Sequence, residues 1–129
     1  MRRVLVDTNV LLAALVFPGG LAASAFSNVV DKERLALTQQ ILDEALHVVR
    51  RKWPDRVGAL DGFLAALDFE LLPVSPSKAV IRDTHDQPIL DAALADGVDI
   101  ILTGDKDFHA LNLARPAVLD PRGYLATIE

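Results

Sequence analysis

The chain has 129 residues, 51% of them hydrophobic and 24% charged, which predicts one globular domain over residues 1–129 with a sizeable core. It contains no cysteine, and this excludes a disulfide framework, thiol catalysis and cysteine-ligated zinc. The net charge of −5 excludes the broad basic surface of a protein that coats duplex DNA, so any contact with nucleic acid must be local.

Strands and helices are expected to alternate along the chain. Short apolar runs predict five strands, at residues 4–6, 34–37, 69–72, 99–102 and 117–119. Apolar residues with helical spacing predict helices at residues 8–16, 21–30, 38–52, 55–67, 88–96 and 105–113. Such alternation forms right-handed βαβ units, so we expect a mainly parallel sheet with helices on both faces.

Local signals mark several helix ends. Thr8 or Asn9 can cap the first helix, and Thr38 is a good N-cap for the long helix after the second strand. Gly97 can end the helix that precedes the fourth strand. The basic residues 50–52 first complement the carboxyl end of the long helix, and contact with RNA is a secondary role for them.

Acidic residues fall where a sheet of this kind has its functional crevice, just past the carboxyl ends of the strands. Asp7 follows the first strand, and Asp105 follows the strand at residues 99–102. If these two strands are neighbours, both carboxylates face the same crevice. Further acids stand at element ends or on a helix that could flank the crevice, namely Glu44, Asp83, Asp86 and Asp107.

Carboxylates that gather in one crevice repel one another, and their pKa values rise unless a cation compensates. Oxygen ligands without cysteine or a histidine cluster suit Mg²⁺ or Mn²⁺ better than zinc. Such a site can deprotonate a bound water and neutralise the charge that develops on a phosphodiester. The sequence therefore predicts metal-assisted phosphodiester hydrolysis, with either one ion or two.

Each acid also has a purely structural explanation. Asp7 and Asp105 can cap the helices that follow them, and Glu44 can belong to a solvated helix face. Asp83 and Asp86 can favour the positive end of a helix. Location favours the metal site, because capping does not require Asp7 and Asp105 to lie at one edge of the sheet.

Four segments, in this order, carry a resemblance to the PIN-domain family, and in particular to the VapC-like toxins of type II toxin–antitoxin pairs. They are VLVDTNVLLAAL, ILDEALHVVRR, RDTHDQPIL and IILTGDKDF, and the likeness covers essentially the whole chain. It implies a three-layer α/β/α fold with a five-stranded sheet and a Mg²⁺- or Mn²⁺-dependent endoribonuclease that cuts single-stranded RNA. It also implies a homodimer and a small antitoxin protein that inserts side chains into the acidic pocket.

The resemblance also assigns roles to residues by position. It implies that four acids form the catalytic metal site, namely Asp7, Glu44, Asp86 and Asp105. Asp107 resembles an auxiliary metal ligand, and Asn9 and Thr103 match polar residues that support the ligands by hydrogen bonding. Asp7, Asp86 and Asp105 would hold one ion directly, and Glu44 would help to hold it or a second one.

The third segment departs from the commoner family pattern, because His85, Gln87 and Pro88 dilute its acidic run. Either Asp86 or Asp83 can therefore be the third ligand. Asp86 fits the family spacing to the later acids better, and we take it as the ligand, with Asp83 in support.

Rival functions meet obstacles in the sequence. A receiver-like phosphoacceptor domain needs an acid pair after the first strand and a lysine after the strand at 117–119, and neither is present. A haloacid-dehalogenase-type phosphatase needs a second aspartate where Asn9 stands. A non-catalytic binding relative and a stand-alone RNA-processing nuclease stay open. We expect a cytoplasmic protein, because no window is long and apolar enough to span a bilayer.

Overall fold

The computed structural model describes residues 1–73, 86–111 and 113–128. Its centre is a five-stranded sheet in the order β3-β2-β1-β4-β5, with every neighbouring pair parallel. The strands are β1 (Arg3–Val6), β2 (Arg34–Thr38), β3 (Glu70–Leu72), β4 (Ile100–Leu102) and β5 (Ala117–Leu119). The expected five-stranded α/β fold is therefore confirmed, and each strand begins within one residue of its predicted position.

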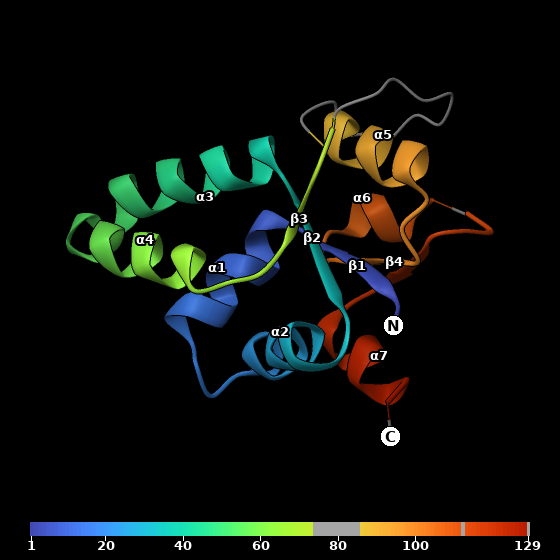
Figure 1. Cartoon of the computed structure of the whole chain (residues 1–129), viewed down its shortest axis with the longest axis horizontal. Helices are drawn as coiled ribbons and strands as arrows, with labels where there is room; N and C mark the ends of the chain where they lie inside the picture. The colour runs from blue at the N-terminus through green and yellow to red at the C-terminus, as the bar shows by residue number, and fades with distance from the viewer. Residues whose placement is uncertain (74–85, 112, 129) are drawn as a thin grey trace.

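Helices cover both faces of the sheet (Figure 1). They are α1 (Thr8–Val16), α2 (Leu21–Lys32), α3 (Gln39–Lys52), α4 (Val57–Ala65), α5 (Gln87–Asp96), α6 (Lys106–His109) and α7 (Pro121–Ala126), with a 3₁₀ turn η1 at Pro54–Arg56 before α4. Helices α1 to α4 and α7 lie on one side, and α5 and α6 lie on the other (Figure 1). These are the three layers expected from the alternation of strands and helices.

The two central strands are buried on both faces, which explains why they read as continuous apolar runs. In β1, Val4, Leu5 and Val6 have no exposed surface, and Ile101 and Leu102 of β4 have none either. The backbone N–H of Asp7 donates to the carbonyl of Leu102 over 3.1 Å, so the ladder between these strands continues to the carboxyl edge. The sheet core therefore fixes the position of whatever follows β1 and β4.

Strand order reverses between β1 and β4. The chain moves outward from β1 to β2 and β3, then crosses back to β4 and continues to β5 at the opposite edge. In open parallel sheets, a crevice forms beyond the carboxyl ends of the strands at this switch point. Asp7 follows β1 there, and residues 103–105 follow β4.

The helix boundaries follow local chemistry, with one correction. Asp7, and neither Thr8 nor Asn9, caps α1, because its carboxylate accepts the backbone N–H of Val10 over 3.1 Å. Thr38 caps α3 as expected, and Gly97 ends α5 with a positive φ of 66° that suits glycine. The expected helix at 55–67 is divided into η1 and α4, and the one at 105–113 ends at residue 109.

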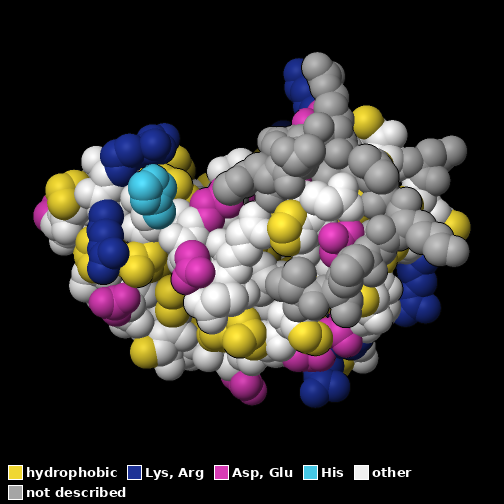
Figure 2. All heavy atoms as spheres, turned by 90° about the horizontal axis from the view of Figure 1, so that it is seen from above, with side chains coloured by type: hydrophobic (Ala, Val, Ile, Leu, Met, Phe, Trp, Pro, Cys, Tyr) yellow, Lys and Arg dark blue, Asp and Glu magenta, His cyan; other side chains and the backbone are white. Residues whose placement is uncertain are grey.

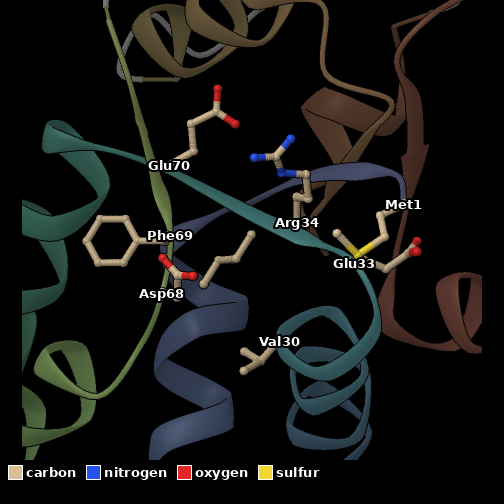
Figure 3. Close-up of a pocket in the computed structure, with 8 residues that line it drawn as sticks. Met1, Val30, Glu33, Arg34, Asp68, Phe69 and Glu70 are labelled. Atoms are coloured by element: carbon tan, nitrogen blue, oxygen red, sulfur yellow. The ribbon is translucent and has the colours of Figure 1, made fainter.

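Arginines and acids are paired at the amino edge of the sheet. Arg3 donates to Glu70 over 2.5 Å and to the carbonyl of Asp96 over 2.6 Å. The bond from Arg3 to Glu70 lowers the pKa of Glu70. Figure 3 shows the Arg34 guanidinium of β2 pointing toward the Glu70 carboxylate of β3, beside a pocket at this edge. Arg2 likewise pairs with Glu33 at the end of α2. Basic charge at this edge is therefore largely neutralised.

Helix α7 was not expected from the sequence. Asp120 caps it by accepting the backbone N–H of Gly123 over 2.7 Å, and Pro121 stands in its first turn. Tyr124 is fully buried, and its hydroxyl donates to Asn28 of α2 over 2.6 Å. The pair Asp120-Pro121 is the sequence signal that could have predicted the start of α7. The buried Tyr124 holds this short helix against α2.

No single helix in the described ranges is long and apolar enough to cross a membrane. Helices α1 and α2 pass that test of length and composition only when taken together, and they are bent by 105° relative to each other.

Because Tyr124 joins α7 to α2, its two interactions should be separable by substitution. We expect Tyr124→Phe to lower the free energy of unfolding by about 1 kcal/mol through loss of the hydrogen bond. Tyr124→Ala should lower it by roughly 3–5 kcal/mol, because it also leaves a cavity. Urea unfolding followed by circular dichroism measures both values. Equal losses for the two variants would contradict the packing role of the ring.

Candidate active site

Asp7 is a nearly buried carboxylate, only 5% exposed, at the junction of β1 and α1. One carboxylate oxygen accepts the backbone N–H of Val10, and the N–H of Asn9 also interacts with this carboxylate. The other oxygen accepts the hydroxyl of Thr103. The residue after β4 fixes one oxygen of Asp7, and the first turn of α1 fixes the other.

Thr103 connects the ends of the two central strands. It is completely buried. Its hydroxyl O–H donates to the carboxylate of Asp7, and its hydroxyl oxygen accepts the backbone N–H of Asp105 over 3.0 Å. Asp105 in turn caps α6 by accepting the N–H of Asp107 over 2.8 Å. One hydrogen-bonded chain thus runs from Asp7 through Thr103 to Asp105 and the start of α6.

Burial makes Asp7 a perturbed acid. Desolvation raises its pKa above the ordinary aspartate range, and the neighbouring charge of Asp105 raises it further. Hydrogen bonds from Thr103 and from the backbone of Val10 act in the opposite direction without cancelling the effect. A cation bound beside these carboxylates would stabilise their charged forms and so oppose the elevation.

The remaining predicted site residues lie on neighbouring elements. Glu44 is half-buried on α3, and Asp86 is the half-buried residue before α5, a helix that contacts α3. Asp107 is half-buried in the first turn of α6, and Asn9 is exposed next to Asp7. Asp83 lies outside the described residues. The structure therefore puts Asn9 and Asp107 close in sequence to Asp7 and Asp105, and it puts Glu44 and Asp86 on or beside the contacting helices α3 and α5.

The donor chemistry at the carboxyl edge fits a hard divalent cation. Asp7 and Asp105 offer carboxylate oxygens, and the chain has no cysteine that would favour a softer metal. The hydroxyl of Thr8, directly after Asp7, is buried and has no hydrogen-bond partner within the described ranges. In that part of the chain, no three histidine, aspartate or glutamate side chains lie close enough together to hold a metal ion. The full ligand set stays a prediction.

Reasoning from the sequence missed one side chain beside this cluster. His109 of α6 lies 2.7 Å, through its ring nitrogen Nε2, from the carbonyl oxygen of Thr103. A carbonyl only accepts, so Nε2 carries the proton and donates it to this bond. His109 stands four residues after Asp105, one helical turn along, and that spacing was the available signal.

A model of the PIN-domain family matches residues 3–107, which is most of the chain. The chain belongs to the PIN-domain family. This membership decides against the receiver and phosphatase alternatives. No curated protein sequence matches the chain significantly.

Three solved structures of toxin or toxin–antitoxin proteins resemble this PIN domain in fold. One is VapBC2 from Rickettsia felis bound to a DNA fragment from its promoter, with a TM-score of 0.70 and 16% identity over 92% of this chain and 98% of that one. DNA-bound VapBC from Salmonella typhimurium gives the same TM-score and identity over 94% and 99%. VapC20 from Mycobacterium tuberculosis, a toxin that cleaves the sarcin-ricin loop, gives 0.62 and 14% over 86% and 96%. At these identities, the likeness shows a shared fold.

The raised pKa of Asp7 predicts how stability depends on pH. The folded state binds the Asp7 proton more tightly than the unfolded state, so ionisation of Asp7 costs stability at pH values above its raised pKa. That cost disappears as the pH falls through the raised pKa to the ordinary aspartate value. Without divalent cations, we expect Asp7→Asn to melt at a higher temperature than the parent at pH 8, with the difference shrinking in acid.

Thermal unfolding between pH 4 and pH 8 measures this difference. Asparagine caps helices as well as aspartate does, so the cap of α1 is kept. Asp61→Asn, at an exposed position of α4, is the matched control and should follow the parent at every pH. A lower melting temperature for Asp7→Asn at pH 8 would mean that the hydrogen bonds of Asp7 outweigh its desolvation.

Proposed function

We propose that this PIN domain is a divalent-metal-dependent endoribonuclease that cuts single-stranded RNA. The observation that carries the proposal is the hydrogen-bonded chain from Asp7 through Thr103 to Asp105 at the switch point of the sheet. Two acids from distant parts of the sequence interact there, and burial raises the pKa of one of them. Membership of the PIN-domain family supports the same reaction class.

The proposed metal site uses Mg²⁺ or Mn²⁺ and four catalytic acids, namely Asp7, Glu44, Asp86 and Asp105. These side chains would have to draw together on binding the ion, because no three of them lie close enough to hold one in the described structure. Asp107 is an auxiliary ligand, and Asn9 and Asp83 support the ligands. When bound, the divalent ion supplies Lewis acidity at the phosphodiester and a water of lowered pKa for in-line attack.

The protein's own contribution is to fix the acids before RNA arrives. The hydroxyl of Thr103 and the backbone of Val10 hold the two oxygens of Asp7 in one orientation. The backbone N–H of Asp105 is held by Thr103, whose carbonyl accepts the ring N–H of His109. Ligands that are fixed in this way lose little entropy on binding an ion.

We further propose that the chain is the toxin of a type II toxin–antitoxin pair. Its fold is shared with VapBC complexes and with VapC20, a toxin that cleaves the sarcin-ricin loop. On this proposal the protein acts in the cytoplasm as a homodimer, and a small antitoxin protein inhibits it. A stand-alone role in RNA processing would use the same site, so expression in cells must separate the two roles.

Removal of either central acid should abolish RNA cleavage. We expect Asp7→Asn and Asp105→Asn to lower the rate of Mg²⁺-dependent cleavage of a labelled single-stranded RNA at least about 100-fold, because each removes a proposed metal ligand. Asp61→Asn should cut at the parental rate. Chelation by EDTA should stop the parent, and Mn²⁺ should restore it. Parental cleavage by the folded Asp7→Asn variant would refute the site assignment.

Expression in bacteria tests the proposed role as a toxin. Induction of the chain alone should arrest growth and fragment cellular RNA, whereas induction of Asp7→Asn should do neither. Co-expression with the adjacent gene that this proposal requires, one encoding a small antitoxin, should restore growth. RNA cleavage without growth arrest would favour the stand-alone processing role, and it would leave the nuclease assignment standing.

A further inference from the structure

An acidic nuclease site must bind a polyanion that its own charge repels. The chain carries a net charge of −5, and the proposed site is built from carboxylates. Affinity for an RNA backbone comes mainly from lysine and arginine side chains that contact phosphates. Arginines at the amino edge are engaged with acids, since Arg2 pairs with Glu33, Arg3 with Glu70 and Arg115 with Asp99. Free basic charge must therefore be sought elsewhere.

Such charge is present at the far end of α3, in a cluster that we call the basic tip. It consists of Arg50, Arg51, Lys52 and Arg56. All four side chains are exposed, and within the described ranges none of them forms an ion pair. Asp55 is the one acid in residues 50–56. The basic tip is therefore a local positive surface on an acidic protein.

Helix α3 carries both the basic tip at its end and Glu44, which the proposed function makes a metal ligand. Gln40, Glu44, His47 and Arg51 follow one another at intervals of four, three and four residues, so they lie on one face of the helix. At 1.5 Å per residue, Arg51 lies about 10 Å along the helix from Glu44. A hollow runs beside this face, and its lining residues are Gln39, Gln40, Asp43, Glu44 and His47.

Figure 2 shows that the basic and acidic side chains share one face of the molecule. Lysine and arginine side chains gather at the left, where α3 ends and α4 begins, with a few acidic side chains near them, and further acidic side chains lie toward the middle. A strand whose phosphate reaches the acidic middle could therefore continue toward the basic tip without crossing to another face.

We propose that the outer face of α3 is a track for the RNA backbone, with Arg50 and Arg51 binding phosphates beside the one that is cut. This inference rests on the proposed nuclease function and adds the positioning residues of its substrate. Compensation of the helix dipole explains part of the cluster, since cations favour a helix carboxyl end. It does not explain Arg56, which lies outside α3, or the alignment of Arg51 with His47 and Glu44.

Binding of RNA to a cleavage-deficient protein tests the track. In an Asp7→Asn background, we compare Arg50→Ala/Arg51→Ala with the matched double variant Lys32→Ala/Arg122→Ala, which removes two exposed basic residues from α2 and α7. The probes are a fluorescein-labelled 12-nucleotide single-stranded RNA and a 4-nucleotide RNA of the same labelling. Fluorescence anisotropy at several salt concentrations gives the dissociation constant and its salt dependence.

We expect the Arg50/Arg51 variant to bind the 12-nucleotide RNA about 10- to 30-fold more weakly at 0.1 M salt. Each phosphate contact on a single strand releases about 0.7 of a counterion, and at 0.1 M salt the loss of two contacts weakens binding by about this factor. The slope itself should fall by about 1.4. The loss should be smaller for the 4-nucleotide RNA, which cannot span both the site and the tip. The Lys32/Arg122 variant should bind both probes like its Asp7→Asn parent.

Two results would overturn the track, and they differ from failure of the proposed function. Equal affinity and equal salt slope for the two double variants would show that the basic tip does not contact RNA. An equal loss for the short and long probes would show a general disturbance and no track. If the parent chain neither binds nor cuts RNA, while Mn²⁺ still raises its melting temperature, the nuclease proposal itself fails.

Discussion

The candidate site depends on one buried side chain that makes two hydrogen bonds. Thr103 has no exposed surface, and its hydroxyl joins the carboxylate of Asp7 to the backbone of Asp105. This contact exists only because β1 and β4 are neighbours in register, with Val6 opposite Leu102. The apolar core that aligns the two strands therefore also sets the distance between the two acids, and a shift in register would separate them.

Burial of Asp7 lowers the stability of the fold without metal, but it favours binding of a cation. A carboxylate that is held out of water at the end of a strand costs the apo fold free energy, as the raised pKa of Asp7 indicates. A polar surface position would avoid that cost, but it would give a mobile and strongly hydrated ligand. Fixed, poorly hydrated carboxylates gain more from a bound cation than mobile ones do. Binding of a metal ion to the folded state would then restore the free energy of unfolding that burial of Asp7 lowers.

Most of the fold could be predicted because it depends on local patterns. Buried strands such as β1 and β4 are continuous apolar runs, and α3 shows its amphipathic spacing and its Thr38 cap in the sequence. The cap of α1 was assigned wrongly because Asp7, Thr8 and Asn9 are all good capping residues, and only the contact with Val10 distinguishes them. Helix α7 was missed because six residues are too few to show a period. The bonds of Thr103 and His109 depend on strand order and on side-chain direction, which a single sequence does not reveal.

Acids at the amino edge of the sheet pair with arginines, whereas Asp7 and Asp105 at the carboxyl edge are in none of the ion pairs of the described residues. At the amino edge, the Arg3 guanidinium bonds to Glu70 and lowers its pKa, and the backbone N–H of Arg3, with the Arg115 guanidinium beside it, lowers the pKa of Asp99. An arginine beside Asp7 would stabilise its charge but would also occupy the place of a metal ion. On the proposed function, basic residues that bind RNA must therefore stand away from the metal ligands, and those at the end of α3 lie two helical turns from Glu44.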